Sequence, residues 1–186
     1  MCHYAAHDMS AIAEELNLAL AGRHPLIYFC THEESRAEAA LRNAAPSVSP
    51  TATVSVWTCV DGLDGDATAE TRDPVGAIRS ILRSPHDGFY LMKDLSAFMG
   101  RPDVVRALRD AYYTLRGRGR AHLVIVSPDL VVPDALDKEV YQVELSLPGS
   151  DEMLAQIARV ESEHPGMRLP PERLSEIALA LRGLTL

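Results

Sequence analysis

Apolar residues gather in five short runs along the chain, and this pattern predicts a β-sheet. Three runs are almost continuously apolar, as in Leu123-Val124-Ile125-Val126, which indicates strands covered on both faces. The other two alternate between apolar and polar residues, which indicates one wetter face and places those strands at the sheet edges. The predicted strands are Leu26 to Thr31, Thr53 to Val60, Gly88 to Leu95, His122 to Ser127 and Val140 to Leu147, of which the second and fifth alternate.

Segments with a helical spacing of apolar residues separate these strands. Such alternation predicts an α/β fold in which helices cover both faces of a parallel five-stranded sheet, in three layers. In the helix from Glu33 to Ala44, Thr31 and Glu34 are expected to form a capping box, and Pro46 to follow its end. Further helices are predicted over Ser10 to Ala21, from Asp73 and Pro74, from Pro102, over Ser150 to Glu163 and over Pro171 to Arg182.

The pattern changes after Pro148-Gly149, because only helical spacing follows. We therefore expect an α/β domain over residues 1–149 and a helical pair over residues 150–186. The longest loop is predicted from Asp61 to Arg72.

Composition narrows the class of protein. The net charge of −8 disfavours nucleic acid and anionic membranes as general partners. No apolar run approaches the ~20 residues that span a bilayer. The three cysteines are an odd number, which suits a reducing compartment, and the first residues lack a signal-peptide pattern. We therefore expect a cytoplasmic protein.

The junction after the first strand is unusual for this architecture. A strand-to-helix junction binds phosphate through a glycine-rich loop and a lysine, but Thr31 to Arg36 contains neither. Glu33 and Glu34 would repel phosphates, whereas they favour a bare helix N-terminus. Only Ser35 offers a hydroxyl near the place of a magnesium ligand. The junction therefore predicts a stabilised helix start and no cofactor, with Mg-ATP binding as the alternative.

Several short stretches resemble one family. The matching segments are Arg23-His24-Pro25-Leu26-Ile27-Tyr28, Val56-Trp57-Thr58-Cys59, Asp73-Pro74-Val75-Gly76-Ala77-Ile78, Ser127-Pro128-Asp129-Leu130-Val131-Val132-Pro133 and Leu181-Arg182-Gly183-Leu184-Thr185. The chain resembles the N-terminal degenerate AAA-like domain of the AAA ATPases typified by chloroplast-encoded and cyanobacterial open-reading-frame proteins. The resemblance implies the strand order 5-1-4-3-2 and makes residues 150–186 a partial AAA lid.

In that family an intact AAA module with a phosphate loop follows this region. The present sequence ends before such a module, so we interpret it as an excised domain or a naturally short homologue. The family's ATPase activity does not carry over, because the residues that perform it are missing here.

The resemblance also implies where a nucleotide site would lie. In active relatives the third strand ends with an Asp for the metal and a Glu for the water. Here Asp94 takes the first place and Leu95 the second, while Ser127 matches the residue that senses the γ-phosphate. The segment Pro133 to Glu139 lacks the arginine finger of active relatives. We therefore expect no catalytic residue.

Loops at the carboxyl ends of the strands are where such sheets build binding sites. The residues that we assign to this rim, as a vestigial nucleotide site, are His32, Glu33, Asp94 and Ser127.

Other candidates have simpler interpretations. Arg116-Gly117-Arg118-Gly119-Arg120 could contact phosphate or RNA, but arginines and glycines also end helices, and we favour the helix end. The acidic loop Asp61 to Glu70 fails the spacing of an EF-hand. No metal site is expected there or among Cys2, His3, His7 and Asp8, and no spacing pairs Cys30 or Cys59 with a histidine base.

The leading hypothesis is a noncatalytic AAA-like domain that lacks a phosphate loop. It would serve as a regulatory, assembly or protein-interaction module of an AAA ATPase system. The expected partners are another protein, an adjoining AAA module or further copies of the chain. The alternative is an atypical nucleotide-binding protein or weak ATPase.

Overall fold

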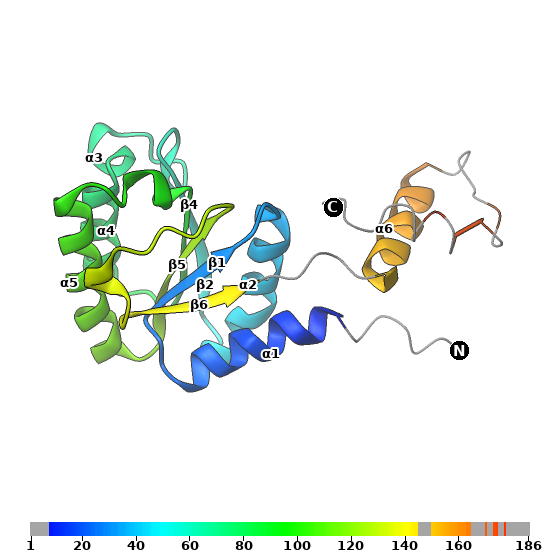
Figure 1. Ribbon diagram of the computed structural model, residues 1–186, viewed down its shortest axis with the longest axis horizontal. Coiled ribbons are helices and arrows are strands. Elements are labelled where there is room, and N and C mark those ends of the chain that lie inside the picture. Colours follow the sequence, from blue (N-terminus) through cyan, green and yellow to red (C-terminus); the bar gives the residue numbers. More distant parts are fainter. Residues whose placement is uncertain (1–7, 145–149, 165–169, 171–172, 175–176, 178–186) are drawn as a thin grey trace. The chain divides into compact units, whose positions relative to one another are not determined.

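The computed structural model describes residues 8–144, 150–164, 170, 173–174 and 177. Residues 15–144 form one compact unit, and the helix α6 belongs to a second. The elements in chain order are α1 (Asp8–Ala21), β1 (Leu26–Cys30), α2 (Glu34–Val48), β2 (Thr53–Thr58), β3 (Gly62–Leu63), α3 (Ala69–Arg72), α4 (Pro74–Arg83), β4 (Gly88–Lys93), η1 (Leu95–Phe98), α5 (Pro102–Arg118), β5 (Ala121–Ser127), η2 (Asp134–Leu136), β6 (Val140–Glu144) and α6 (Ser150–Glu163), where η denotes a 3-10 helix (Figure 1).

The sheet has six strands in the order β3-β2-β4-β5-β1-β6. Every pairing is parallel except the one between β2 and β3. The predicted α/β fold is confirmed. The prediction of an entirely parallel, five-stranded sheet with the second strand at an edge is wrong, because β3 covers that edge.

A tight turn explains this sixth strand, which lies within the predicted loop. Gly62 has a φ of 73°, and a Cβ there would lie 2.1 Å from the carbonyl oxygen of Asp66. The carboxylate of Asp64 then accepts a hydrogen bond of 2.8 Å from the backbone N–H of Val56. A two-residue strand that is held by a glycine turn and an Asp side chain has no alternation of apolar and polar residues. The hydrophobic pattern therefore could not predict β3.

Helices cover both faces of the sheet. In Figure 1, α4 and α5 lie on one face and α2 on the other. The core beneath α4 and α5 contains Ile78, Leu108 and the β5 residues Leu123 and Ile125, all fully buried. Trp57 of β2 is fully buried as well, and its indole N–H donates a 2.6 Å hydrogen bond to the Thr71 carbonyl, which ties β2 to α3.

The start of α2 differs from the predicted capping box. Glu33 is the N-cap residue, and no side chain accepts a hydrogen bond at the cap. The Thr31 hydroxyl instead accepts from the backbone N–H of Glu33, at 3.0 Å, which makes a local turn. Because the helix begins at Glu34, that side chain is too early in the first turn to reach back. Pro46 lies inside the last turn of α2 rather than after it, and because proline has no N–H it cannot donate the helix hydrogen bond to the Arg42 carbonyl.

The arginine-rich stretch ends α5, as expected. Gly119 adopts a left-handed conformation with a φ of 71°, and its N–H donates to the Leu115 carbonyl at 3.0 Å. Arg118 reaches the end of α4, where it donates to the carbonyls of Ser84, at 2.7 Å, and of Leu82. The helix-end interpretation is confirmed, and one arginine caps the neighbouring helix.

Beyond residue 144, α6 matches the first helix of the predicted C-terminal pair. The second helix of that pair and the last three residues of the predicted fifth strand fall largely outside the described residues. Among the helices that the structure describes, none has the length and apolar character needed to cross a membrane.

Candidate functional site

The carboxyl ends of β1, β4 and β5 meet at one edge of the sheet, beside the start of α2. Cys30 lies beside Ser127 in the β1–β5 ladder, and Lys93 lies beside Val126 in the β4–β5 ladder. The N–H of Thr31 donates to the Ser127 carbonyl at 2.9 Å, and the N–H of Asp94 donates to the Val126 carbonyl at the same distance. The four residues predicted for the rim therefore lie on segments that the sheet brings together.

A buried ion pair occupies the junction between β1 and α2. The guanidinium of Arg36 lies 2.9 Å from the carboxylate of Glu33, and the two side chains are 7% and 4% exposed. Only Thr31, His32 and Glu33 connect β1 to α2. Glu33 is thus directed to a cation from its own helix, while His32 is exposed.

A lysine at the end of β4, for which the sequence suggested no role, contacts the first turns of α2. Lys93, the last residue of β4, lies 3.2 Å from the carboxylate of Glu34 and 3.3 Å from that of Glu38. Burial favours the neutral acid at Glu38, but Arg42 and Lys93 outweigh it and lower the pKa of that carboxyl. The spacing of Glu34 and Glu38, one helical turn apart, was the signal for such a cation.

The other two residues predicted for the rim differ in exposure, because Asp94 is exposed and Ser127 is buried. Asp94 is exposed and left-handed, with a φ of 54°, where β4 turns into η1. Ser127 is 2% exposed, and its hydroxyl lies 2.5 Å from the hydroxyl of Ser96 in η1. The Ser127 hydroxyl therefore holds η1 against the end of β5, a contact that sequence reasoning missed.

The connection from β5 to β6 is fixed by side chains beneath it. The hydroxyl of Tyr28 donates to the Asp129 carbonyl at 2.5 Å and accepts from the N–H of Val131 at 3.3 Å. Farther along, Arg109 of α5 donates to the Ala135 carbonyl at 2.5 Å and lies 3.7 Å from the carboxylate of Glu139. An arginine thus contacts the segment from Pro133 to Glu139, although that segment contains none.

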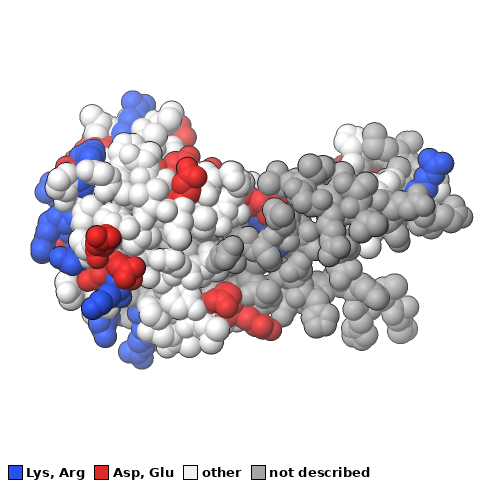
Figure 2. Space-filling model, viewed as in Figure 1, with Lys and Arg blue, Asp and Glu red and all other residues white. Residues whose placement is uncertain are grey.

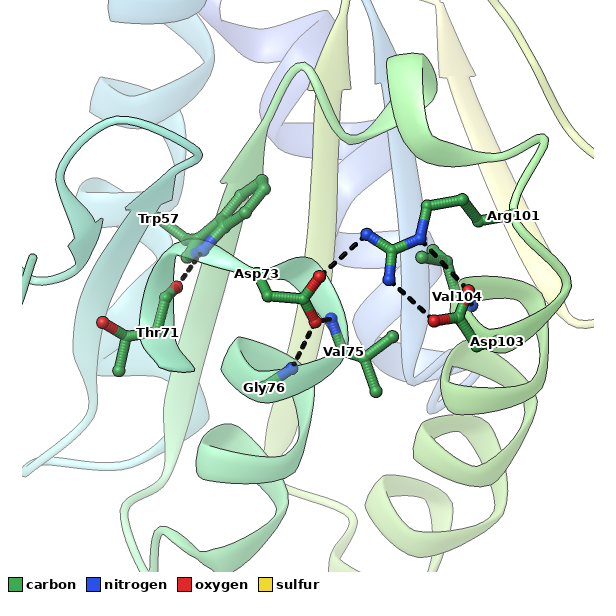
Figure 3. Close-up of polar contacts among 8 residues, drawn as sticks. All are labelled: Trp57, Thr71, Asp73, Val75, Gly76, Arg101, Asp103 and Val104. Atoms are coloured by element: carbon green, nitrogen blue, oxygen red, sulfur yellow. Dashed lines mark hydrogen bonds and ion pairs between the residues drawn. The ribbon is translucent and has the colours of Figure 1, made fainter. Parts of the chain in front are cut away.

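A second polar cluster joins the starts of α4 and α5 (Figure 3). The carboxylate of Asp73 caps α4 by accepting from the N–H groups of Val75, at 3.0 Å, and Gly76, at 3.2 Å. Its other oxygen lies 2.8 Å from the guanidinium of Arg101, which also binds Asp103. Burial raises the pKa of Asp73, but these hydrogen bonds lower it by more.

This cluster gives a structural role to the segment from Asp73 to Ile78, one of those that resemble the AAA family. A Cβ at Gly76 would lie 1.9 Å from the Glu70 carbonyl oxygen, so the close approach of α3 and α4 requires glycine. The segment that begins at Asp73 therefore builds the junction between α3 and α4.

Cys30, Cys59 and the acidic loop are candidates for metal ligation within the described residues. In the described part of the chain, no three His, Cys, Asp or Glu side chains are grouped so that they could hold a metal ion. The thiol of Cys30 donates to the Pro128 carbonyl at 3.4 Å. Cys2, His3 and His7 lie outside the described residues.

Comparison with known protein families identifies the family of this chain. The profile described as the SpoVK-like AAA ATPase, N-terminal domain, matches residues 12–145. The chain belongs to this family. The match covers every strand of the sheet and confirms the N-terminal AAA-like domain expected from the sequence.

The similar proteins of known sequence are longer than this chain. The chain is 28% identical to the uncharacterized AAA domain-containing protein ycf46 of Guillardia theta, over all of this chain and 37% of that protein. It is 26% identical to the ycf46 protein of Pyropia yezoensis, over 93% of this chain and 36% of that protein. The chain thus spans about a third of the length of these relatives.

Solved structures share the fold. Domain III of the replication initiation protein DnaA from Thermotoga maritima is 18% identical, with a TM-score of 0.60, and the match covers 97% of this chain and 79% of that one. AMPPCP-bound DnaA from Aquifex aeolicus is 12% identical, with a TM-score of 0.59, over 97% of this chain and 59% of that one. At such identities the likeness shows the AAA+ fold alone.

Proposed function

We propose that this chain is a noncatalytic AAA-like domain with a degenerate phosphate loop, which acts as a regulatory, assembly or protein-interaction module of an AAA ATPase system. The observation that carries the proposal is the ion pair between Glu33 and Arg36. It fills the start of α2, where a nucleotide-binding relative would place phosphate. A phosphate there would meet the carboxylates of Glu33 and Glu34 at close range.

Two further features support the loss of hydrolysis. Leu95 is fully buried where active relatives carry the residue that activates water. Arg109, which contacts the Pro133–Glu139 segment, is engaged with Ala135 and Glu139 of the same chain. In this proposal Asp94 and Ser127 are retained for the turn into η1 and its attachment to β5.

The length of the relatives supports a role beside an active module. Both relatives are described as AAA domain-containing proteins, and this chain matches only about a third of each. We propose that its partner is an adjoining AAA module or a second protein, and that the exposed rim around His32 and Asp94 contributes to the contact. A cytoplasmic location fits the exposed thiol of Cys59.

Phosphate release tests the proposal directly. The chain should hydrolyse Mg-ATP no faster than a Glu33→Ala/Glu34→Ala variant, and Asp94→Ala should leave the background rate unchanged. Hydrolysis above that of the double variant, and lost in Asp94→Ala, would contradict a noncatalytic domain.

One observation favours the alternative of an atypical nucleotide-binding protein. Lys93 brings an ammonium group to the first turns of α2 from β4 instead of from a phosphate loop. If it bound a phosphate, Lys93→Met would weaken nucleotide binding. If Lys93 only pairs with Glu34 and Glu38, Lys93→Met should change stability and leave the absence of binding as it was.

A further inference from the structure

An apolar loop tip stands out on the surface of the unit formed by residues 15–144. Leu130 and Val131 are 48% and 42% exposed, although both are aliphatic. Their backbone is held from beneath, because the buried Tyr28 hydroxyl binds the Asp129 carbonyl and the Val131 N–H. We call residues 129–133 the apolar tip. A tip that is already fixed loses little conformational entropy on binding, which is the property of an interface anchor.

The surroundings of the apolar tip are acidic. Asp129 lies next to Leu130 in the loop, and Asp134 and Asp137 follow it in and after η2; all three are exposed, whereas Lys138 is the one cation between residues 129 and 139. A surface that receives the apolar tip should therefore combine an apolar floor with cations at its rim.

Such a surface exists between α4 and α5. A groove there has an apolar floor made of Val75, Ile78, Leu82 and Ala107, and its polar lining consists of Arg79, Arg106, Asp103 and Asp110. We call it the α4–α5 groove. Its two carboxylates are already paired, Asp103 with Arg101 and Asp110 with Arg106. Arg79 is exposed, and the structure shows no ion pair for it within the described residues.

The basic residues of the chain are concentrated in the part of the sequence that forms α4 and α5. Residues 72–120 hold ten of the 18 lysines and arginines of the chain, but only five of its 26 acidic residues. Figure 2 shows many of the basic side chains over α4 and α5. The remainder of the chain is strongly acidic. An excess of cations around α4 and α5 is electrostatically complementary to the acidic loops of a second copy.

We propose that the apolar tip of one copy docks into the α4–α5 groove of a second copy, with Asp129 opposite Arg79. Leu130 and Val131 would pack against the half-buried side chains of Leu82 and Ala107, and the Asp129 carboxylate would neutralise the Arg79 guanidinium. This proposal names a partner for the interaction role proposed above and rests on that role. It does not depend on nucleotide, because neither surface contains a residue of the rim.

Sedimentation velocity on the 186-residue chain tests this contact. The sedimentation coefficient should rise with protein concentration across the micromolar range. It should fall when NaCl is raised from about 0.05 to 0.5 M, which screens the ion pair. Arg79→Glu and Asp129→Lys should each weaken association at least tenfold. Arg83→Glu is the matched control, because Arg83 is an exposed α4 arginine outside the groove that pairs with Glu70.

Complementation separates docking from a general charge effect. In an equimolar mixture of the Arg79→Glu and Asp129→Lys variants, the intact apolar tip of one can enter the intact groove of the other, so association should return. Tyr28→Phe keeps the core but frees the loop, and it should weaken association without lowering the melting temperature by more than a few degrees.

Two results would overturn the proposal: a chain that stays monomeric at high micromolar concentration, or association that Leu130→Ser/Val131→Ser and the charge variants leave unchanged. Neither result would bear on nucleotide binding. Conversely, nucleotide hydrolysis would contradict the proposed function and leave this contact standing, so the two failures are distinguishable.

Discussion

The carboxylate of Glu33 lies 2.9 Å from the guanidinium of Arg36, and both side chains are almost completely buried. Removing one member of a buried ion pair leaves the other charge poorly compensated, which costs about 3–5 kcal/mol. We expect Arg36→Ala to lower the free energy of unfolding by an amount near the lower end of that range. Urea denaturation followed by circular dichroism measures it.

The matched control for this prediction removes both charges. Glu33→Gln/Arg36→Met retains much of the packing without a buried ion, so it should be clearly more stable than Arg36→Ala. If the single and double variants were equally stable, the pair would not be a coupled structural element of the junction.

The cap formed by Asp73 should contribute measurably to stability. Asp73→Ala removes the acceptor for two α4 amides and the partner of Arg101, and we expect a loss of about 1–2 kcal/mol. Asp73→Asn keeps an acceptor oxygen but loses the charge, so it should cost less than half as much. Thermal unfolding of the two variants side by side checks the order, and equal losses would assign the effect to charge alone.

Burial of His122 predicts a pH dependence of stability. The side chain is 3% exposed, and its Nδ1 lies 2.9 Å from the His24 carbonyl oxygen. Burial lowers the pKa of this imidazole below its ordinary value of 6.5, although the hydrogen bond opposes the shift. The unfolded chain therefore binds a proton more readily, and stability falls as the pH drops through about 6.5.

The measurement is the free energy of unfolding between about pH 8 and pH 5. His122→Asn should remove the part of the acid-side decline that comes from this group, while leaving the other titrations in place. A decline of the same slope in the wild type and in His122→Asn would contradict the assignment.

Two glycines at the end of α5 should respond in opposite directions to alanine. Gly119 has a φ of 71°, so Gly119→Ala should destabilise the chain by about 1 kcal/mol. Gly117 lies inside the helix with open space at its Cβ position, so Gly117→Ala should stabilise it by about 0.5–1 kcal/mol. Melting temperatures of the two variants test the prediction, and a shift of the same sign would contradict it.

The elements that could be predicted from the sequence are those with a strong periodic pattern. The continuous apolar run around Leu123 predicted a buried strand. Gly119, which follows a helical spacing of apolar residues, predicted the end of α5. The strand β3 could not be found in this way, because it is two residues long and is fixed by Gly62 and the side chain of Asp64.

The sequence predicted where the candidate site lies in the fold, but not which side chains its residues contact. Chain order and strand ends indicated that His32, Glu33, Asp94 and Ser127 share one edge of the sheet. Two of the contacts at this site are tertiary, because Lys93 of β4 pairs with Glu34 of α2 and Ser96 of η1 contacts Ser127 of β5. The pair of Glu33 and Arg36 is local, three residues apart. The capping box failed for a local reason, because the Thr31 hydroxyl bonds the N–H of Glu33 and the helix begins only at Glu34.

The most direct test of the central claim is calorimetric titration of Mg-ATP into the 186-residue chain. With the junction between β1 and α2 occupied by Glu33 and Arg36, we predict no heat of binding at micromolar nucleotide, in the wild type as in Glu33→Ala/Glu34→Ala. Stoichiometric micromolar binding by the wild type would contradict the account, above all if Ser127→Ala or Lys93→Met abolished it.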